Sequence, residues 1–338
     1  MAYLIRGICG REAAPAGADA VETHDVSHPI RTVAVVVVTY NSAHLLADLV
    51  GSLPGGLEGH SWQLVIADNA SADDTVATAR RLAPQATIVE TGRNGGYAAG
   101  INAGVAAAFS SDPDVDAVLV LNPDVRLEPD CVAALARELA VPGVGVTVPR
   151  LVDAEGRLFE SMRGAPSLVR AFADAVVGAN RAGRVRWAGE IVADPAEYER
   201  GQDTDWAEGS TQLISAECWR ACGPWDESYF LYSEETEFHL RARDRGFRVR
   251  FVPAARAMHL GGESTTSPGL WALLVANRVR LFTVRRGRVQ GAAYWLMVLA
   301  RECSRALLGK QTSRRAVRTL VSPRRMSAPR GPEWVASA

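Results

Sequence analysis

The stretch VAVVVVTYNS, residues 33–42, carries the clearest structural signal in this chain. Its first six residues are all apolar, so neither face of an extended strand would present a polar side chain. A strand of this kind is typical of a parallel sheet that is covered by helices on both sides. The polar residues Thr39–Ser42 follow at once. We therefore predict a buried strand that ends in a polar loop.

Similar apolar runs recur along the first half of the chain, at residues 63–68, 86–91 and 116–124. Segments with helical spacing separate them, at residues 43–53, 71–83 and 100–109. In the second of these helices, Ser71 and Asp74 occupy the positions of a capping box. Strands that alternate with helices form right-handed βαβ units. The sequence therefore predicts an α/β fold, Rossmann-like, with a mostly parallel sheet flanked by helices.

The pattern loosens after residue 127. Strand-like segments are expected near residues 144–152 and 248–257, and a strand that enters a helix at 210–223, whereas residues 160–205 look irregular. We interpret this half as an extension of the same sheet. The expected organisation is a flexible leader (1–30), a main α/β domain (31–265, divided into 31–127 and 128–265) and a basic helical extension (266–338).

Polar side chains stand where the predicted strands end, and ligands of open α/β sheets bind at that edge. The first strand is followed by Thr39, Tyr40 and Asn41, and the second ends in Asp68. The carboxylate of Asp68 is suited to accept a hydrogen bond from the imide N–H of a nucleotide base. The alternative, that Asp68 is a turn or capping residue, stays open.

The segment LNPDV places Asn122 and Asp124 at the end of another buried strand. Mg²⁺ and Mn²⁺ take oxygen ligands, and Mg²⁺ usually binds through one or two carboxylates together with substrate phosphates. Asp124 is thus a candidate metal ligand, although an Asn-Pro-Asp turn is the alternative. His259, which follows a strand-like segment, is a candidate ligand for the metal or a diphosphate. A lone histidine is otherwise more often structural.

The stretch GRNGGYAAGINAG, residues 92–104, does not carry glycines at the spacing of a dinucleotide fingerprint. Chemistry that depends on a nicotinamide cofactor therefore loses its main support. A glycine-rich turn into a helix still allows a sugar nucleotide to approach the backbone closely.

The stretch FLYSEETEF, residues 230–238, places Glu234, Glu235 and Glu237 among large apolar residues. Carboxylates are rarely buried unless they are paired, so the pattern suggests a functional site. The alternative is an ordinary helix N-terminus with Ser233 as N-cap. We expect Glu237 to pair with Arg241 one turn later. Crowding of the acids should raise at least one pKa.

The formal net charge of the 338 residues is −1, which argues against a general nucleic-acid-binding protein. From residue 267 onward, however, fourteen Lys and Arg face only Glu302 and Glu333. Two interpretations stay open: amphipathic helices on an anionic membrane surface, or a basic helical pair packed on the body. No apolar run is long enough to span a bilayer. Because no secretory signal follows Arg6, we expect a cytoplasmic protein at the inner face of the membrane.

Taken together, six segments in order over residues 33–266 resemble the family 2 glycosyltransferases of GT-A fold, especially rhamnosyltransferase-like members. They are VVVVTYNSAHLL, VIADNASADDT, GRNGGYAAGINAG, VLVLNPDVRL, the long segment from Glu208 to Val249, and AMHLGGEST. Such enzymes transfer a sugar from a nucleoside diphosphate, either dTDP- or UDP-linked here.

The resemblance also implies roles for individual residues. Nucleotide-sugar contacts are implied for Asp68, for Arg93, Asn94 and Gly95, and for Asn122, which stands where the family's first metal-binding acid is usual. Asp124 would bind Mg or Mn, with His259 as a further ligand. Trp225 and Asp226 match the segment that shapes the acceptor pocket. Glu235 aligns with the catalytic base, and Glu234 is the fallback.

The function expected from this resemblance is inverting, metal-assisted transfer of rhamnose or a related hexose to a lipid-linked or cell-envelope glycan. Peripheral membrane contact would come from the C-terminal region. The same chemistry on a soluble acceptor, and a protein that binds nucleotide sugars without catalysis, are the alternatives.

Overall fold

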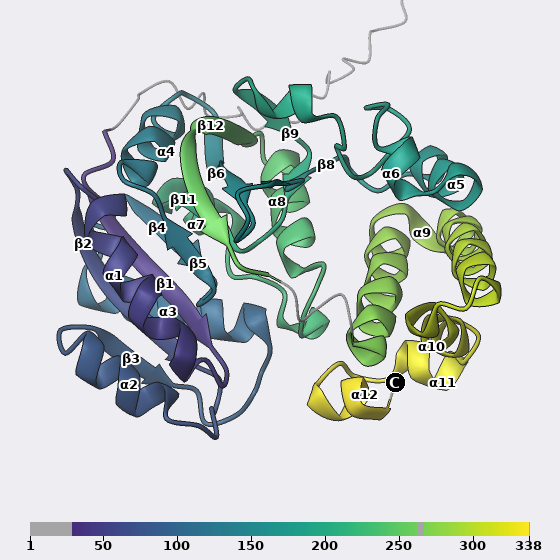
Figure 1. Ribbon diagram of the computed structural model, residues 1–338, viewed down its shortest axis with the longest axis horizontal. Coiled ribbons are helices and arrows are strands. Elements are labelled where there is room, and N and C mark those ends of the chain that lie inside the picture. Colours follow the sequence, from purple (N-terminus) through teal and green to yellow (C-terminus); the bar gives the residue numbers. More distant parts are fainter. Residues whose placement is uncertain (1–28, 262–266, 338) are drawn as a thin grey trace, which may run out of the picture.

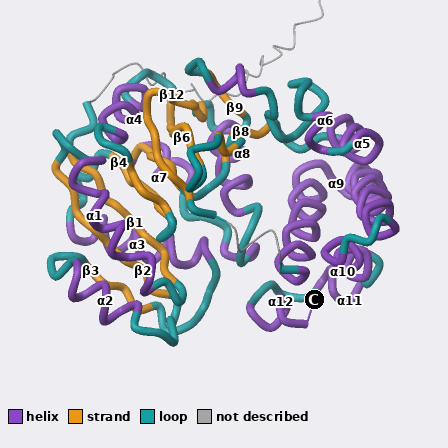
Figure 2. Tube along the Cα trace, in the orientation of Figure 1, coloured by secondary structure: helices purple, strands orange, loops and turns teal. Residues whose placement is uncertain are grey.

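The computed structural model describes residues 29–261 and 267–337, which form a body built on one twisted sheet and a separate group of C-terminal helices (Figure 1). Helices cover both sides of the sheet, and Figure 2 shows the change from mixed structure to helices alone at the C-terminal end. The leader expected over residues 1–30 lies almost entirely outside the described residues.

The first half of the chain has the predicted alternation. Strands β3, β2, β1 and β4 lie side by side in this order, and each pair is parallel. This confirms the predicted α/β fold. The elements are β1 Thr32–Thr39, η1 Ala43–Leu45, α1 Leu46–Gly56, β2 Ser61–Asp68, α2 Thr75–Leu82, β3 Thr87–Glu90, α3 Tyr97–Ser111, β4 Ala117–Leu121 and β5 Val125–Leu127.

The second half continues the same sheet in the order β4-β11-β6-β12-β5, with β11 antiparallel to both of its neighbours. The elements are α4 Cys131–Leu139, β6 Val144–Val152, β7 Leu158–Phe159, β8 Met162–Arg163, α5 Leu168–Val177, α6 Ala179–Ala182, η2 Pro195–Tyr198, β9 Gln202–Thr204, β10 Trp206–Ala207, β11 Thr211–Ser215, α7 Ala216–Cys222, η3 Glu227–Tyr229, α8 Glu234–Asp244 and β12 Arg248–His259. Residues 160–205, expected to be irregular, thus contain a ten-residue helix, α5.

Strand β1 is buried on both faces, as its sequence predicts. Val33, Val35 and Val37 belong to the core that lies under α1 and α4. Ala34 and Val36 belong to the core on the opposite face, under α3, α7 and α8. Successive side chains of a strand point to opposite faces, so a strand between two cores needs apolar residues at every position.

Glycines in α3 let this helix lie close to β1. A Cβ atom added to Gly100 would stand 2.5 Å from a methyl carbon of Val38, and one added to Gly104 would stand 2.5 Å from a methyl carbon of Val36. Real Cβ atoms do not approach other carbons so closely. Part of the glycine-rich signal at residues 92–104 therefore reflects packing of a helix on a strand.

The C-terminal region is helical, as expected from its spacing. It contains α9 Pro268–Leu307, α10 Gln311–Leu320, α11 Pro323–Ser327 and α12 Pro332–Ser337. Helix α9 is divided at Gly287, whose φ of 82° breaks the helical backbone. The two halves fold back on each other as a hairpin (Figure 1). Within the described ranges, no helix is long and apolar enough to span a bilayer.

One local prediction is wrong. Asp74 is the N-cap residue of α2, but its side chain makes no capping bond. Ser71, the other residue of the expected capping box, donates its hydroxyl to Asp68 instead, at 2.6 Å. The loop before α2 is shaped by the end of β2 rather than by the helix.

We predict that Gly100→Ala lowers the free energy of unfolding by about 1–3 kcal/mol, because the new methyl group overpacks the contact with Val38. The matched control is Gly51→Ala in α1, where nothing lies within 4 Å of the added carbon. That control should be neutral or stabilising by up to about 1 kcal/mol. Urea titration of both variants measures the difference, and equal effects would contradict the packing argument.

Candidate active site

The carboxyl ends of β1 and β2 form one side of the candidate site. Thr39 and Asp68 are register partners, and the hydroxyl of Thr39 donates to the Asp68 carboxylate at 2.8 Å. Ser71 donates to the same carboxylate through both its hydroxyl and its N–H. Asp68 is buried and held as a turn residue would be, while Tyr40 is half exposed at the rim. The Oδ1 atom of Asn41 accepts the N–H of Ala72.

The glycine-rich turn joins this side to the loop after α7. The Oδ1 atom of Asn94 accepts the N–H of Gly96, and Arg93 lies 3.8 Å from the carboxylate of Glu227. The N–H of Tyr97 donates to the carbonyl of Phe230 at 2.8 Å. A side chain at Gly96 would collide with the backbone of Phe230. The φ of 89° at Gly96 also favours glycine.

Asp124 and His259 meet at the end of the sheet. The Nε2 atom of His259 lies 3.3 Å from Oδ2 of Asp124. They are brought together because β12 pairs with β5, with His259 opposite Val125, the residue after Asp124. Burial raises the pKa of Asp124, but the hydrogen bond and the charge of His259 outweigh burial, so the pKa of Asp124 is lowered overall. The pKa of His259 is raised: burial lowers it, but its bond to Asp124 and the charges of Glu208 and Asp124 prevail.

Glu208 is a site residue that the sequence analysis did not identify. It lies just before β11, and its carboxylate accepts both the N–H (3.1 Å) and the hydroxyl (2.6 Å) of Ser210. The carbonyl of Ser210 accepts the N–H of Asn122 at 2.8 Å. Because β11 runs antiparallel to β4, the start of β11 lies at the same edge as the end of β4. Sequence reasoning considered only strand ends and therefore missed it.

Glu234 and Glu235 begin α8, behind a strained turn. Phe230, Tyr232 and Ser233 all have positive φ, between 66° and 78°. Ser233 makes no side-chain cap, so the N-cap alternative is not supported by a bond. Such strain is commonly found at functional sites, where the surrounding structure holds it. The expected pair of Glu237 with Arg241 is present at 2.8 Å.

The two acids at the start of α8 differ in their surroundings. Glu234 is buried, and burial followed by the charge of Glu235 raises its pKa well above the usual range. Glu235 is only half-buried, and burial together with the charge of Glu208 raises its pKa to about 7. The expectation that crowding raises at least one pKa is therefore confirmed. Glu235 therefore titrates near neutral pH.

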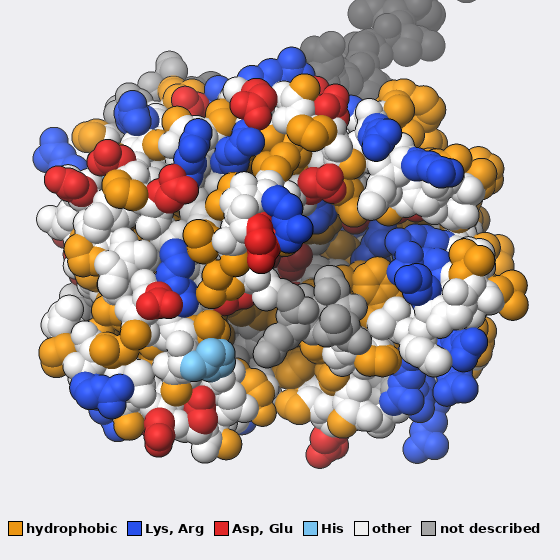
Figure 3. All heavy atoms as spheres, viewed as in Figure 1, with side chains coloured by type: hydrophobic (Ala, Val, Ile, Leu, Met, Phe, Trp, Pro, Cys, Tyr) orange, Lys and Arg blue, Asp and Glu red, His pale blue; other side chains and the backbone are white. Residues whose placement is uncertain are grey.

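The phenol of Tyr97 is affected by acids from several segments of the chain. Burial raises the pKa of its phenol, and the carboxylates of Glu208, Glu234, Asp124 and Glu235 raise it further. These four acids come from three separate segments of the chain, and all of them act on the same phenol. A Cβ atom at Gly209 would lie 3.1 Å from that of Glu235, and the Tyr97 hydroxyl donates to the Gly209 carbonyl. Figure 3 shows the molecule hollowed between the body and the C-terminal helices, with acidic side chains at the hollow.

Trp225 and Asp226 do not present free side chains at this centre. Trp225 is buried and stacks on Phe238, with ring centroids 5.4 Å apart. The carboxylate of Asp226 accepts the N–H of Ser228 at 2.9 Å. In this structure the two residues contribute to the shape of the loop, and direct acceptor contact by the Trp225 ring would require movement.

A buried amide in the C-terminal helices holds the strained turn. Asn277 of α9 is fully buried, and its Nδ2 group donates to the carbonyls of Tyr229, Leu231 and Tyr232 at 2.9–3.0 Å. The Nε group of Arg330 donates in turn to Oδ1 of Asn277, at 3.1 Å. Helix α9 therefore contacts the segment that positions Glu234 and Glu235. No local pattern in the sequence reveals this contact.

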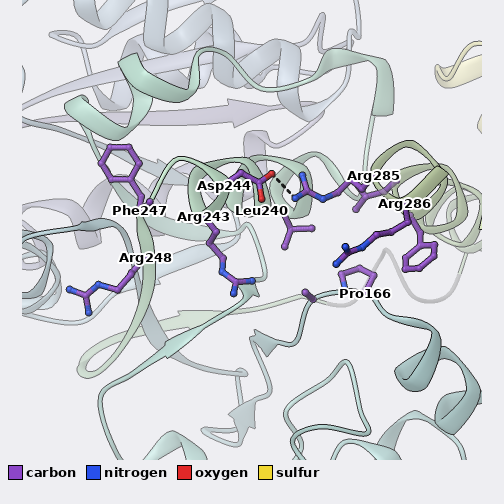
Figure 4. Close-up of a pocket in the computed structure, with 12 residues that line it drawn as sticks. Pro166, Leu240, Arg243, Asp244, Phe247, Arg248, Arg285 and Arg286 are labelled. Atoms are coloured by element: carbon purple, nitrogen blue, oxygen red, sulfur yellow. Dashed lines mark hydrogen bonds and ion pairs between the residues drawn. The ribbon is translucent and has the colours of Figure 1, made fainter. Parts of the chain in front are cut away.

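A pocket with a volume of about 460 Å³ lies elsewhere, at the opposite end of α8 (Figure 4). Arginines line it, but most are already paired with acids: Arg285 with Asp244 at 2.6 Å and Arg243 with Asp205 at 2.9 Å. This pocket is remote from the acids at the N-terminus of α8. It is not the candidate site.

The chain matches the family described as Glycosyl transferase family 2 over residues 34–180, and Glycosyl transferase family group 2 over residues 117–301. A relative from Mycobacterium tuberculosis, N-acetylglucosaminyl-diphospho-decaprenol L-rhamnosyltransferase, is 30% identical over 242 residues, which are 68% of this chain and 76% of the relative. The Low-salt glycan biosynthesis hexosyltransferase Agl10 of Haloferax volcanii is 26% identical, over 67% of this chain and 66% of its own.

Solved structures share the fold. The mannosyltransferase PcManGT from Pyrobaculum calidifontis, in complex with GDP-Man and Mn²⁺, has a TM-score of 0.53 and 17% identity, covering 88% of this chain and 82% of its own. Glucosyl-3-phosphoglycerate synthase from Mycobacterium tuberculosis, in complex with Mn²⁺, UDP and glucosyl-3-phosphoglycerate, has a TM-score of 0.50 and 16% identity, covering 74% of this chain and 80% of its own. At these identities the likeness concerns the fold alone, which is the GT-A fold expected from the sequence.

We predict that Asn277→Ala weakens the turn that precedes α8. Three carbonyls would lose their donor, which should lower the free energy of unfolding by about 1–3 kcal/mol and speed hydrogen exchange at the Tyr97 amide. Asn180→Ala, at an exposed position in α6, is the control and should change stability by less than about 0.5 kcal/mol. An unchanged Tyr97 exchange rate would show that Asn277 does not hold the turn.

We also predict a pH-dependent effect of Glu235→Gln on stability. Below the ordinary pKa of 4.5, Glu235 is protonated in the folded and unfolded states alike. As the pH rises through 7, the unfolded state is already ionised and the folded state must bury a charge, so the native protein loses stability. The variant should therefore match the native protein near pH 4 and exceed it near pH 8 in denaturant titrations. Greater relative stability of the variant in acid would mean that the sign is wrong.

Proposed function

Since this chain is a rhamnosyltransferase-like member of the family 2 glycosyltransferases, we propose that it is an inverting enzyme that uses a dTDP- or UDP-linked donor. It would transfer rhamnose or a related hexose to a hydroxyl group of a lipid-linked glycan. The observations that carry the proposal are the contact of Asp124 with His259 at the ligand-binding edge of the sheet and the close approach of Glu235 to Gly209, the residue after Glu208.

Glu235 is the general base in this proposal. Its carboxylate accepts the proton of the acceptor hydroxyl while that oxygen attacks the anomeric carbon, and the bond from that carbon to the nucleoside diphosphate breaks in the same displacement. A pKa near 7 suits a base that works at neutral pH. Glu234 is more deeply buried, and this burial raises its pKa well above the usual range, so it is the weaker candidate and would support the position of Glu235.

The donor would lie across residues 31–127. The uracil or thymine ring of the nucleotide would be held near Asp68 and the exposed ring of Tyr40, between Thr39 and Asn41. The ribose and diphosphate would lie near Asn122. The turn formed by Arg93, Asn94 and Gly95 would contact the diphosphate side. Thr39 and Ser71 already donate hydrogen bonds to Asp68. The nucleotide ring would therefore donate to the remaining acceptor sites of that carboxylate. Residues 128–265 would hold the acceptor.

A divalent cation, Mg²⁺ or Mn²⁺, fits Asp124. Its Oδ1 atom is buried and has no hydrogen-bond partner among the described residues, as expected of an oxygen reserved for a ligand. No group of three or more His, Cys, Asp or Glu in the described ranges is arranged to hold a metal, so substrate phosphates would complete the site with Asp124, and His259 beside it. When bound, such a cation neutralises charge on the diphosphate.

The acceptor assignment draws on the relative from Mycobacterium tuberculosis, whose name describes rhamnosyl transfer to N-acetylglucosaminyl-diphospho-decaprenol. A comparable lipid-linked acceptor would require the enzyme to work at a membrane surface. We propose peripheral contact through the C-terminal region, at the inner face of the cell membrane. Trp225 and Asp226 would act on the acceptor pocket through the shape of their loop.

The test is transfer of radiolabel from dTDP-rhamnose and from UDP-sugars to a membrane extract. We predict that Glu235→Gln and Asp124→Ala each lower transfer by at least about a hundredfold. In the native enzyme, kcat/KM should rise with pH to a plateau above about 7, because only ionised Glu235 accepts the proton. The Glu235→Gln variant should lack this rise.

Glu155→Gln, in an exposed turn, is the control and should leave transfer unchanged. Thermal shift with each nucleotide sugar, with and without manganese, checks that the variants still bind donor. Full activity of Glu235→Gln would overturn the assignment of the base. Transfer to a soluble acceptor but to no lipid-linked one would overturn the acceptor class.

A further inference from the structure

Helix α5 presents an apolar face to solvent. Val169, Phe172 and Val176 are 54%, 58% and 64% exposed, and their spacing of three and four residues places them on one side of the helix. The opposite side, with Ala171, packs between the two halves of α9. Ordinary surface helices show the reverse, with polar residues outward. The sequence analysis did not identify this helix.

The second half of α9 presents a similar face. Val289, Leu296 and Leu307 are 87%, 57% and 88% exposed. Their separations of seven and eleven residues each correspond closely to whole turns, so they form one stripe along the helix. We call the exposed apolar side chains of these two helices the docking face, defined by Val169, Phe172, Val176, Val289, Leu296 and Leu307.

The two helices that carry the docking face pack on each other. Pro166, just before α5, and Arg286, at the bend of α9, line one pocket and lie near each other in Figure 4. Ala171 of α5 and Val298 of the second half of α9 share one core. Figure 3 shows apolar side chains along the edge of the molecule that carries α5 and this half of α9.

The segments that carry the docking face have few acids of their own. Four acids occur in residues 168–190 and 268–337, and Asp174, Glu190 and Glu302 are buried, which leaves Glu333 on the surface. Many arginines nearby are exposed and form no ion pair within the described part of the chain: Arg181, Arg184, Arg286, Arg288, Arg314, Arg318 and Arg324. Trp187, which follows Arg181 and Arg184 in the sequence, is 71% exposed. The arginines near this face would attract anions.

We propose that the docking face rests in the headgroup region of a bilayer rich in anionic phospholipid. Apolar side chains would enter the boundary between headgroups and acyl chains, and the arginines would meet lipid phosphates. A second copy of this chain is a poorer occupant, because a two-fold interface would bring unpaired arginines of both copies together. This proposal specifies which surface makes the membrane contact of the proposed function. It rests on that function for the assumption that the acceptor is lipid-linked. It extends that contact to α5, outside the C-terminal region.

The docking face also lies on the helical unit that holds the site. The first half of α9 carries Asn277, which binds the turn before Glu234 and Glu235. A bilayer bound to α5 and the second half of α9 would therefore be bound to the group of helices that positions the base. A lipid-linked acceptor and the enzyme would meet at a fixed orientation.

The experiment is flotation of the full chain with vesicles that contain no acceptor, made either of phosphatidylcholine alone or of equal parts phosphatidylcholine and phosphatidylglycerol. We expect binding to the anionic vesicles only. The double variant Phe172→Gln with Leu296→Gln should bind on the order of tenfold less tightly, and Arg181→Glu with Arg184→Glu should make binding insensitive to phosphatidylglycerol. Val141→Gln and Arg81→Glu, exposed positions on the body, are the matched controls and should bind like the native chain.

Equal binding of the Phe172 and Leu296 double variant and the native chain would overturn the proposal. So would a solution dimer that this variant dissociates while no vesicle binding occurs. Activity separates the two proposals: transfer to a lipid-linked acceptor in detergent without vesicle binding would defeat the docking face and leave the function standing. Vesicle binding without transfer to any acceptor would support the docking face and defeat the proposed function.

Discussion

The close approach of two backbones, at Gly96 and Phe230, holds the two halves of the catalytic body in register at the site. The N–H of Tyr97 donates to the Phe230 carbonyl, and no side chain fits at position 96. This single contact connects the turn after β3 with the turn before α8. It requires Phe230 to adopt a positive φ, which turns its carbonyl away from the ordinary path of the chain. The position of Glu235 therefore depends on residues more than a hundred positions earlier.

Crowding of acids at this centre is tolerated because each carboxylate meets a different environment. Asp124 has His259 beside it, and Glu208 accepts two hydrogen bonds from Ser210. Burial and the charge of Glu235 raise the pKa of Glu234 well above its usual range. Glu235 is left as the acid whose charge changes near neutral pH. An arrangement in which all four were ionised, with no partner, would cost several kcal/mol in a buried setting.

Sequence patterns predicted the parts of the fold that depend on neighbouring residues. The run at 33–38 predicted a strand between two cores, and the strand ends located Thr39, Asp68 and Asp124 at one edge. Features that depend on distant partners were not predictable. Glu208 lies at this edge only because β11 runs antiparallel to β4. Asn277 contacts the turn before α8 although it is 48 residues from Tyr229 in the sequence, and no local pattern indicates that contact.

Two local predictions failed for physical reasons that a single sequence does not reveal. The expected capping box at Ser71 gave way to a hydrogen bond with Asp68, because the serine hydroxyl had a charged partner within reach. Helix α5 was overlooked because its outward face is apolar, so it lacks the alternation of polar and apolar residues that marks a surface helix. The outward face of α5 is part of the proposed docking face, where apolar side chains would meet the bilayer.

The bond from Arg330 to Asn277 has a consequence for how the enzyme comes into being. On the ribosome, the body with its acids emerges long before residue 330 is made, so the turn ahead of α8 exists for a time without its clamp. The parallel strands of the sheet are synthesised first, and the turn ahead of Glu234 and Glu235 gains its bonds from Asn277 only after α9 has followed. Under the proposed mechanism, competence for chemistry would therefore arrive late in translation, when the C-terminal helices dock, and not when the sheet is complete.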